Sequence, residues 1–204
     1  MKQISLWVIA ASLSICALAF TACTNGGSTS ESASGEITEA TADVATDTTP
    51  DTYLAAIDRY MVNDIAVNYA QAEYHIPVDI IVAVDESNPD SVLVWGDFWI
   101  ENYNISADTL LFVSGGSHPG LMHVAKTGSA YTVTAFDVVE DGSHFLPSAK
   151  RIFGDKFDAF QKIQSNDELR KELRRMAVSA YVKQNGIKAV MYKDYGWDPV
   201  QLEQ

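Results

Sequence analysis

Cysteine is almost absent from this chain: of its 204 residues, only Cys16 and Cys23 are cysteines. Residues 24–204 therefore cannot form a disulfide with one another. They also offer neither a cysteine nucleophile nor a thiolate ligand for a metal ion. A domain in this part of the chain must be stabilised by its apolar core, and cysteine hydrolases and thiolate-metal proteins are excluded as functional classes.

Basic residues are also scarce, with 14 Lys and Arg against 27 Asp and Glu and a formal net charge of −13. Residues 51–147 contain only Arg59 and Lys126, whereas residues 148–204 hold most of the others. This charge makes nucleic acid and an anionic membrane surface poor partners. The asymmetry is explained by simple solvation; alternatively, the two regions attract each other or face different partners.

Recognisable catalytic motifs are missing as well, and there is no internal repeat or EF-hand spacing. The glycine-rich segment 114–120 is neither a phosphate loop, because no Gly-Lys-Ser/Thr follows, nor a nucleophile elbow, because Pro119 replaces the second glycine. Glycine and proline together favour a structural loop. In the alternative interpretation, Ser117 and His118 line a site at the rim of a sheet.

The start of the chain carries an export signal. Lys2 precedes an apolar stretch over residues 4–22, and Cys23 follows small residues. This arrangement resembles the lipobox of bacterial lipoproteins, with Phe20 at a position where leucine is usual. The resemblance implies cleavage before Cys23 and a lipid on its thiol. An uncleaved membrane anchor is the alternative, although Ser12 and Ser14 interrupt the apolar run.

Residues 24–50 are rich in Ser, Thr, Gly, Ala and Glu, and such a composition predicts a disordered tether. Thr24 does not match the aspartate of inner-membrane retention signals, so we expect the outer membrane. Residues 25–28 lack the acidic cluster of surface-exposed lipoproteins, which favours a periplasmic orientation. The chain then divides into a signal peptide (1–22), a lipidated tether (23–50) and one folded domain (51–204).

The domain shows helical periodicity at both ends and strand patterns between them. A first helix capped by Asp51 or Thr52 is expected to end at Pro77. Later helices begin at a Ser148 cap and at a Ser165–Glu168 capping box, the second with Ala180 facing inward and Gly186 as its stop. The expected strands, with a loop at 114–120, are Ile80–Val84, Ser91–Tyr103, Leu110–Val113, Leu121–Ala125, Tyr131–Glu140 and Ile187–Tyr192.

Separate blocks of strands and helices indicate an α+β fold, in which a first helix packs on a curved antiparallel sheet of four to five strands. This arrangement resembles nuclear-transport-factor-2-like and cystatin-like folds, although long C-terminal helices depart from the former. Three segments, at 115–120, 138–143 and 148–153, look like small uncharacterised lipoproteins of gut Bacteroidales. That resemblance implies no activity.

Two tryptophans in the clearest strand are candidates for binding. Trp95 and Trp99 share a strand face that is apolar like the opposite face, so the strand is expected to be covered on both sides. The pair either stacks on a sugar, a peptide or another apolar ligand, or packs beneath the C-terminal helices. Ser117 and His118 complete the candidate binding residues.

Histidines and carboxylates supply the candidates for chemistry. His118, His123, Asp97 and Asp137 would act as acid–base groups if a pocket brought them together. No helical His-x-x-x-His pair is present, and we expect neither a metal site nor a cofactor.

These patterns leave three functional classes open. The leading hypothesis is a noncatalytic lipoprotein domain that binds a small molecule, a peptide or another envelope protein. The second is an enzyme with a His/Asp acid–base pocket between helix and sheet, and the third is a purely structural envelope protein.

Overall fold

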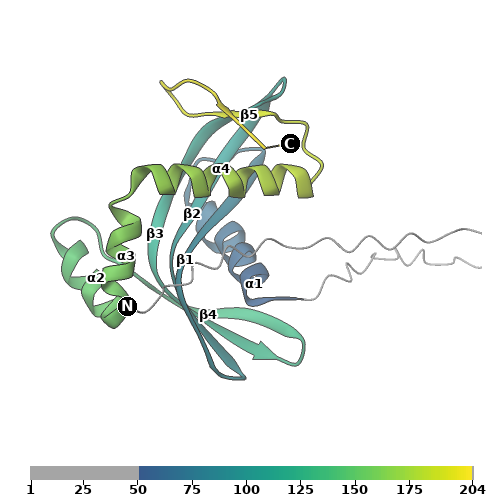
Figure 1. Ribbon diagram of the computed structural model, residues 1–204. Helices are drawn as coiled ribbons and strands as arrows, with labels where there is room; N and C mark the ends of the chain where they lie inside the picture. Colours follow the sequence, from purple (N-terminus) through teal and green to yellow (C-terminus); the bar gives the residue numbers. More distant parts are fainter. Residues whose placement is uncertain (1–50, 204) are drawn as a thin grey trace, which may run out of the picture. The chain divides into compact units, whose positions relative to one another are not determined.

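A computed structural model describes residues 51–203 (Figure 1). Helices and strands alternate in blocks, which confirms the predicted α+β class. The strands are β1 (Tyr74–Asn88), β2 (Ser91–Ser106), β3 (Thr109–Thr127), β4 (Ala130–Val138), β5 (Met191–Lys193) and β6 (Val200–Gln201). The α-helices are α1 (Tyr53–Tyr60), α2 (Phe145–Phe153), α3 (Phe157–Gln164) and α4 (Asp167–Gln184).

The sheet has six strands rather than the expected four to five. Strands β1 to β4 form an antiparallel meander, in which successive strands pair. β5 pairs in parallel with the first residues of β3, and β6 follows it at the sheet edge. The expected last strand, Ile187–Tyr192, is therefore shorter, begins later and runs parallel to its neighbour.

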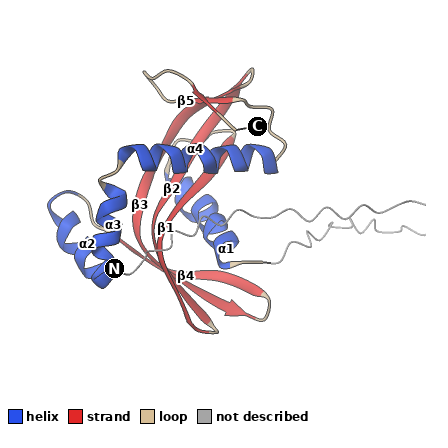
Figure 2. Ribbon diagram, in the orientation of Figure 1, coloured by secondary structure: helices blue, strands red, loops and turns tan. Residues whose placement is uncertain are grey.

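Helices cover both faces of this sheet (Figure 2). One face of β2 presents Val94 and Phe98 to α1, and we call it the α1 face. The other presents Trp95 and Tyr103 to the later helices, and we call it the α2–α4 face. Each fully buried large apolar side chain contributes about 1.5–3 kcal/mol to the free energy of unfolding. The expectation that β2 is covered on both sides is confirmed.

Helix α1 begins at its predicted cap but ends early. The Thr52 hydroxyl accepts a hydrogen bond from the Ala55 amide (3.1 Å). The helix continues as a π-helical segment, Met61–Ile65, and a 3₁₀ turn, Ala66–Asn68. The predicted end at Pro77 is wrong, because Pro77 lies within β1. β1 is an edge strand, where the missing N–H of proline need not cost a ladder hydrogen bond.

The glycine-rich segment is not a loop, contrary to our expectation. Residues 114–120 form the middle of β3 and pair with β2. A Cβ atom at Gly116 would lie 2.4 Å from the Tyr69 hydroxyl, and one at Gly120 would lie 2.3 Å from the Asp137 carbonyl oxygen. These glycines therefore permit close approach within a strand rather than a turn. The Pro119 carbonyl accepts from the Val139 amide (2.8 Å), just past the end of β4.

The helical block also begins differently from the prediction. Ser148 lies inside α2, where its hydroxyl donates to the His144 carbonyl (2.7 Å) and accepts from the Glu140 amide (3.0 Å). It therefore joins α2 to the chain that leaves β4 instead of capping a helix. Gly154, with φ of 53°, follows the last residue of α2. It begins a 3₁₀ turn, Gly154–Lys156, which leads into α3.

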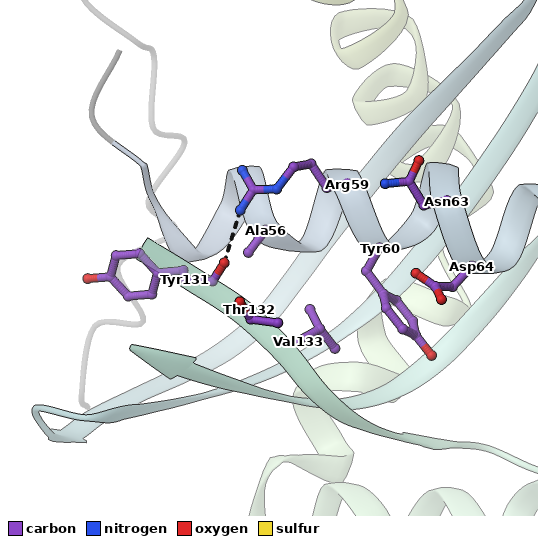
Figure 3. A pocket seen from close by; sticks show the side chains of 8 residues that line it. All are labelled: Ala56, Arg59, Tyr60, Asn63, Asp64, Tyr131, Thr132 and Val133. Carbon is purple, nitrogen blue, oxygen red and sulfur yellow. Dashed lines mark hydrogen bonds between the residues drawn. The ribbon is translucent and has the colours of Figure 1, made fainter. Parts of the chain in front are cut away.

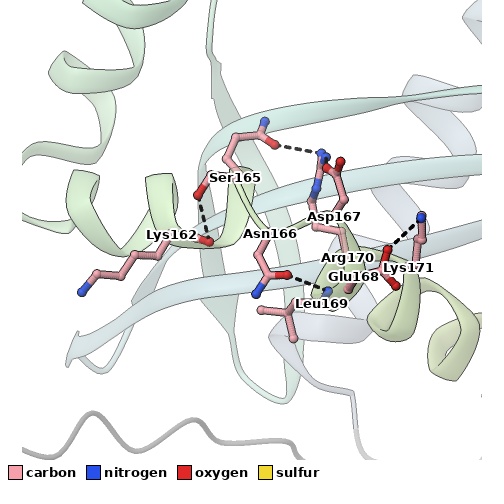
Figure 4. Close-up of polar contacts among 9 residues, drawn as sticks. Lys162, Ser165, Asn166, Asp167, Glu168, Leu169, Arg170 and Lys171 are labelled. Atoms are coloured by element: carbon pink, nitrogen blue, oxygen red, sulfur yellow. Dashed lines mark hydrogen bonds and ion pairs between the residues drawn. The ribbon is translucent and has the colours of Figure 1, made fainter.

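The cap of α4 is Asn166, one residue beyond the predicted Ser165. The Asn166 side chain accepts from the Leu169 amide (3.1 Å), and Glu168 pairs with Lys171 rather than closing a capping box (Figure 4). Ala180 faces solvent, whereas the arginines Arg170 and Arg174 lie partly buried. Gly186 ends the helix as predicted, with φ of 63° and the Ile187 amide donating to the Val182 carbonyl (2.9 Å).

Candidate functional site

Asp97 and Ser117 meet on the α2–α4 face. The Ser117 hydroxyl donates to Asp97 Oδ1 (2.5 Å), and Asp97 is fully buried. Burial raises the pKa of Asp97, while the bond from Ser117 lowers it. Asp97 Oδ2 has no hydrogen-bond partner in the described part of the chain. The pair is a buried polar contact between β2 and β3.

His118 lies on the opposite side of the sheet. It pairs across the strands with Phe98, on the α1 face, and its Nε2 is 2.9 Å from the Tyr69 hydroxyl. Burial lowers the pKa of His118, which favours its neutral form. Successive strand residues face opposite ways. Ser117 and His118 therefore form no nucleophile–base pair, and His118 does not meet Asp97 on a common face.

His123 and Asp137 are brought together, on β3 and β4. His123 Nε2 lies 3.0 Å from Asp137 Oδ2, and 36% and 59% of their respective side-chain surfaces are exposed. Asp137 also borders a shallow hollow of about 410 Å³ between β4 and α2. No hydroxyl is hydrogen-bonded to the His123 ring among residues 51–203. The pair can orient an imidazole for proton transfer, but it has no adjacent nucleophile.

A second hollow, of about 210 Å³, lies between α1 and β4 (Figure 3). Arg59 closes one end, because its guanidinium donates to the Tyr131 carbonyl (3.0 Å) and to Asp51 (2.8 Å). Asp51 also accepts from the Tyr131 amide (2.7 Å). The bonds to Arg59 and Tyr131 hold the pKa of Asp51 below its usual value. Arg59 is thus occupied in securing the start of the domain to β4.

The strand tryptophans do not form an exposed platform. Trp95 is 8% exposed, and its indole N–H donates to the Ile152 carbonyl of α2 (3.0 Å). The Lys156 ammonium lies 4.3 Å from the centre of its ring. Trp99 is half-buried and packs against the cluster that contains Tyr103. Trp95 therefore anchors α2 to the sheet.

The exposed aromatic side chains lie elsewhere, in the loop between β5 and β6. Tyr195 is 95% exposed and Trp197 is 74% exposed. We call residues 194–199 the aromatic loop; in Figure 1 it projects, in yellow, beyond the sheet. No apolar periodicity marks this segment in the sequence. The one sequence feature that indicates exposed aromatic side chains here is a pair of aromatic residues on either side of Gly196, in a stretch outside any predicted element.

One arginine fixes the base of the aromatic loop. Arg174 of α4 binds Asp194 through two hydrogen bonds, from Nη1 to Oδ2 (2.6 Å) and from Nη2 to Oδ1 (2.8 Å). Its Nη2 also contacts Glu101 (2.5 Å) and the Tyr103 hydroxyl (2.7 Å). We call these four residues the Arg174 cluster. Bidentate pairing of arginine with a carboxylate restricts both position and angle.

Aromatic rings enclose the guanidinium of Arg174. Its Cζ lies 4.9 Å from the centre of the Tyr192 ring and 5.7 Å from that of Phe112. Burial lowers the pKa of Arg174, but the bond to Asp194 and the charge of Glu101 outweigh this and raise it overall. Burial raises the pKa of Glu101, which Arg174 opposes. The cluster is thus a charged network at the edge of the apolar core.

Backbone contacts close the loop on both sides. The Trp197 amide donates to the Asp194 carbonyl (3.2 Å), and Gly196 supplies a positive φ of 79°. Beyond the loop, the Leu202 amide donates to the Val190 carbonyl (2.8 Å), and the Leu202 side chain is buried. The aromatic side chains are therefore carried by a segment that is held at each end.

A pair of carboxyl groups lies where α1 meets β1. Desolvation on its inner side raises the pKa of Asp58 to about 6, although the residue as a whole keeps an exposed surface, and its neighbour Asp79 lowers it. Burial and the nearby charge of Asp58 raise the pKa of Asp79 well above its usual range. Asp79 Oδ1 is buried and finds no conventional donor in the described chain. The two groups are best accommodated when they share a proton.

No protein family, curated protein or solved structure shows a significant match to this chain. Among the helices of residues 51–203, none is both long and apolar enough to cross a membrane. The same residues contain no group of three or more His, Cys, Asp or Glu side chains placed to hold a metal ion.

Replacing Arg174 tests the Arg174 cluster. In Arg174→Met, Glu101 loses its cation while it remains buried, so we expect the free energy of unfolding to fall by about 3–5 kcal/mol in urea titrations. Arg175→Met is the control. Arg175 pairs with the exposed Glu172 and Glu203, so its loss should cost about 1 kcal/mol or less. Equal losses in both variants would contradict a special role for Arg174.

The Asp58–Asp79 pair should make stability depend on pH. Because the folded pKa values are raised, the folded chain binds more protons than the unfolded chain between about pH 4 and pH 6. The pair's contribution to the free energy of unfolding is therefore present at about pH 4 and is lost as the pH rises through the raised pKa values, the lower of which is about 6, at Asp58. Asp79→Asn should flatten this part of the profile and raise the free energy of unfolding at pH 7.5. Asp64→Asn, at an exposed residue, serves as the control. If the slope of the free energy of unfolding against pH is unchanged in Asp79→Asn, the Asp58–Asp79 pair is not its source.

Proposed function

We propose that this chain is a lipid-anchored lipoprotein of the cell envelope whose domain, residues 51–204, is a noncatalytic binding module. The lipobox-like sequence at Cys23 supports the anchor, but residues 1–50 lie outside the described residues. We place the protein at the outer membrane, facing the periplasm. Its partner is a small molecule, a peptide or another envelope protein, with no role for nucleic acid.

The binding function is inferred mainly from the aromatic loop, because its two aromatic side chains are exposed while Arg174 holds its base through Asp194. Two large aromatic side chains at such exposure leave apolar surface in water, and covering it with a partner would be favourable. Tyr and Trp are also the side chains that contribute most to interfaces. Because the Arg174 cluster restrains the base of the loop, binding would require less loss of conformational freedom.

An enzyme remains the second candidate, supported by one observation. The His123–Asp137 pair stands beside a hollow, as an acid–base site would require. Against it, both side chains are substantially exposed, and the other candidates, Asp97 and His118, point to opposite faces. Under this alternative, Asp137→Asn would abolish turnover of a substrate that the wild type converts, while the fold stays intact.

Lipidation is tested by fractionating cells that produce the full chain. Cys23→Ala removes the acceptor thiol, so we expect the protein to move from the membrane fraction to the soluble fraction. Cys16→Ala, within the predicted signal, should leave the membrane fraction unchanged. Mass spectrometry of the membrane form should show diacylglycerol on Cys23. Retention of Cys23→Ala in the membrane would refute this anchor.

The binding function is tested with the combined substitutions Tyr195→Ala and Trp197→Ala in the full chain. Extracted in mild detergent, the wild type should migrate on a native gel as a complex larger than the processed protein alone, and the variant as the free protein. Both side chains are exposed, so the circular dichroism spectrum should not change. Val67→Ala with Leu146→Ala is the control, because both are exposed apolar side chains outside the aromatic loop. Identical migration of the wild type and the loop variant would count against binding through this loop.

A further inference from the structure

The aromatic loop projects beyond the sheet and exposes both of its aromatic side chains, and this limits what it can bind. The Tyr195 and Trp197 side chains form no hydrogen bond with another described residue, and neither of the two hollows described above includes them. Small molecules and short sugars usually bind in concave sites that bury most of their surface. A projecting aromatic tip instead requires a cavity in its partner.

We propose that the aromatic loop inserts into an apolar pocket of a partner protein, at the end of the domain farthest from the membrane tether. This inference rests on the proposed binding function. It adds that the partner is a protein and that the partner lies beyond the end of the domain that carries the loop. Each buried aromatic side chain removes about 150–250 Å² from water. Two such side chains on a restrained loop resemble the few anchor residues that dominate most interfaces.

The position of the loop in the sheet supplies the direction. The domain begins at Asp51, which bonds to Tyr131, and Tyr131 pairs with Lys126 near the end of β3. The aromatic loop follows β5, which pairs with Leu111 near the start of β3. Lys126 and Leu111 are about 15 strand residues apart, so the two ends are separated by about 50 Å along β3. Figure 1 shows β4 and the yellow loop at opposite ends of the sheet.

This separation disfavours the bilayer as the partner. As a random coil, a chain of about 27 residues, the length of the predicted tether, would have a root-mean-square span of about 30 Å. For the loop to touch the bilayer, the tether would have to run back along the domain over a longer distance. The net charge of −13 also opposes close approach to anionic lipid. A partner protein beyond this end of the domain requires neither a tether that runs back along the domain nor close approach to anionic lipid.

The surroundings of the loop indicate the chemistry of the pocket. Val200, which follows the loop, is 37% exposed and extends the apolar surface. Lys193 and Asp198 are exposed beside the aromatic side chains and have opposite charges. The complementary site would therefore have an apolar centre and a rim that carries both charges, as protein interfaces commonly do.

The experiment uses the full chain in living cells, with the photo-crosslinking amino acid p-benzoylphenylalanine in place of Trp197. The matched control carries the same probe in place of Ser129, an exposed residue in the turn between β3 and β4, at the other end of the sheet. After irradiation, mass spectrometry identifies the adducts. We expect one protein adduct from position 197 that disappears when Tyr195→Ala is added, and no such adduct from position 129.

The identified protein is then purified, and its affinity for the full chain is measured. Trp197→Ala should weaken binding by about 30-fold, as for an interface anchor residue, and exposed Leu146→Ala should leave the affinity unchanged. Lipid or glycan adducts from position 197 would overturn this inference but leave a binding function. A protein adduct that persists without Tyr195, or an affinity unchanged by Trp197→Ala, would overturn it as well. No adduct of any kind from position 197 would overturn both the inference and the binding function.

Discussion

The pairing of Arg174 with Glu101 and Asp194 is the interaction on which the arrangement of the C-terminal half depends. Glu101 belongs to the central strand β2, Arg174 to α4, and Asp194 to the segment that leaves β5. One guanidinium therefore joins a helix, the sheet and the aromatic loop. Burying these charges is costly, and only a bidentate geometry with further hydrogen bonds offsets the cost. Such a network selects one geometry more strongly than apolar packing alone, because every misalignment leaves a buried charge unpaired.

This constraint links packing to function. The core on the α2–α4 face holds α4 through Val178 and Val182, which places Arg174 above β2. Arg174 then fixes the start of the aromatic loop, while Leu202 fixes the chain after it. Tyr195 and Trp197 remain in solvent although the backbone on either side is secured. An exposed aromatic pair on a secured backbone loses little freedom on binding, which suits an interaction module.

Much of the fold follows from local sequence patterns. The two-sided apolar pattern predicted β2 and its coverage by helices, and the helix caps predicted α1 and the end of α4. The patterns failed where tertiary contacts decide. Gly116 and Gly120 look like turn residues, but they lie in a strand, at positions where Tyr69 and the backbone of Asp137 leave no room for a side chain. Trp95 could not be distinguished from a binding residue until α2 was seen to cover it. The Arg174 cluster joins residues far apart in sequence, and no local pattern encodes such a contact.

We expect the Arg174 cluster to hold the aromatic loop in one conformation before any partner binds. The most direct measurement is the backbone ¹⁵N order parameter of residues 194–199 in the isotopically labelled protein without a partner. A loop that the Arg174 cluster restrains should give values near 0.85, as in rigid backbone, for Tyr195 and Trp197. Values below about 0.6 at these residues would contradict it, because the loop would then be flexible on the nanosecond timescale.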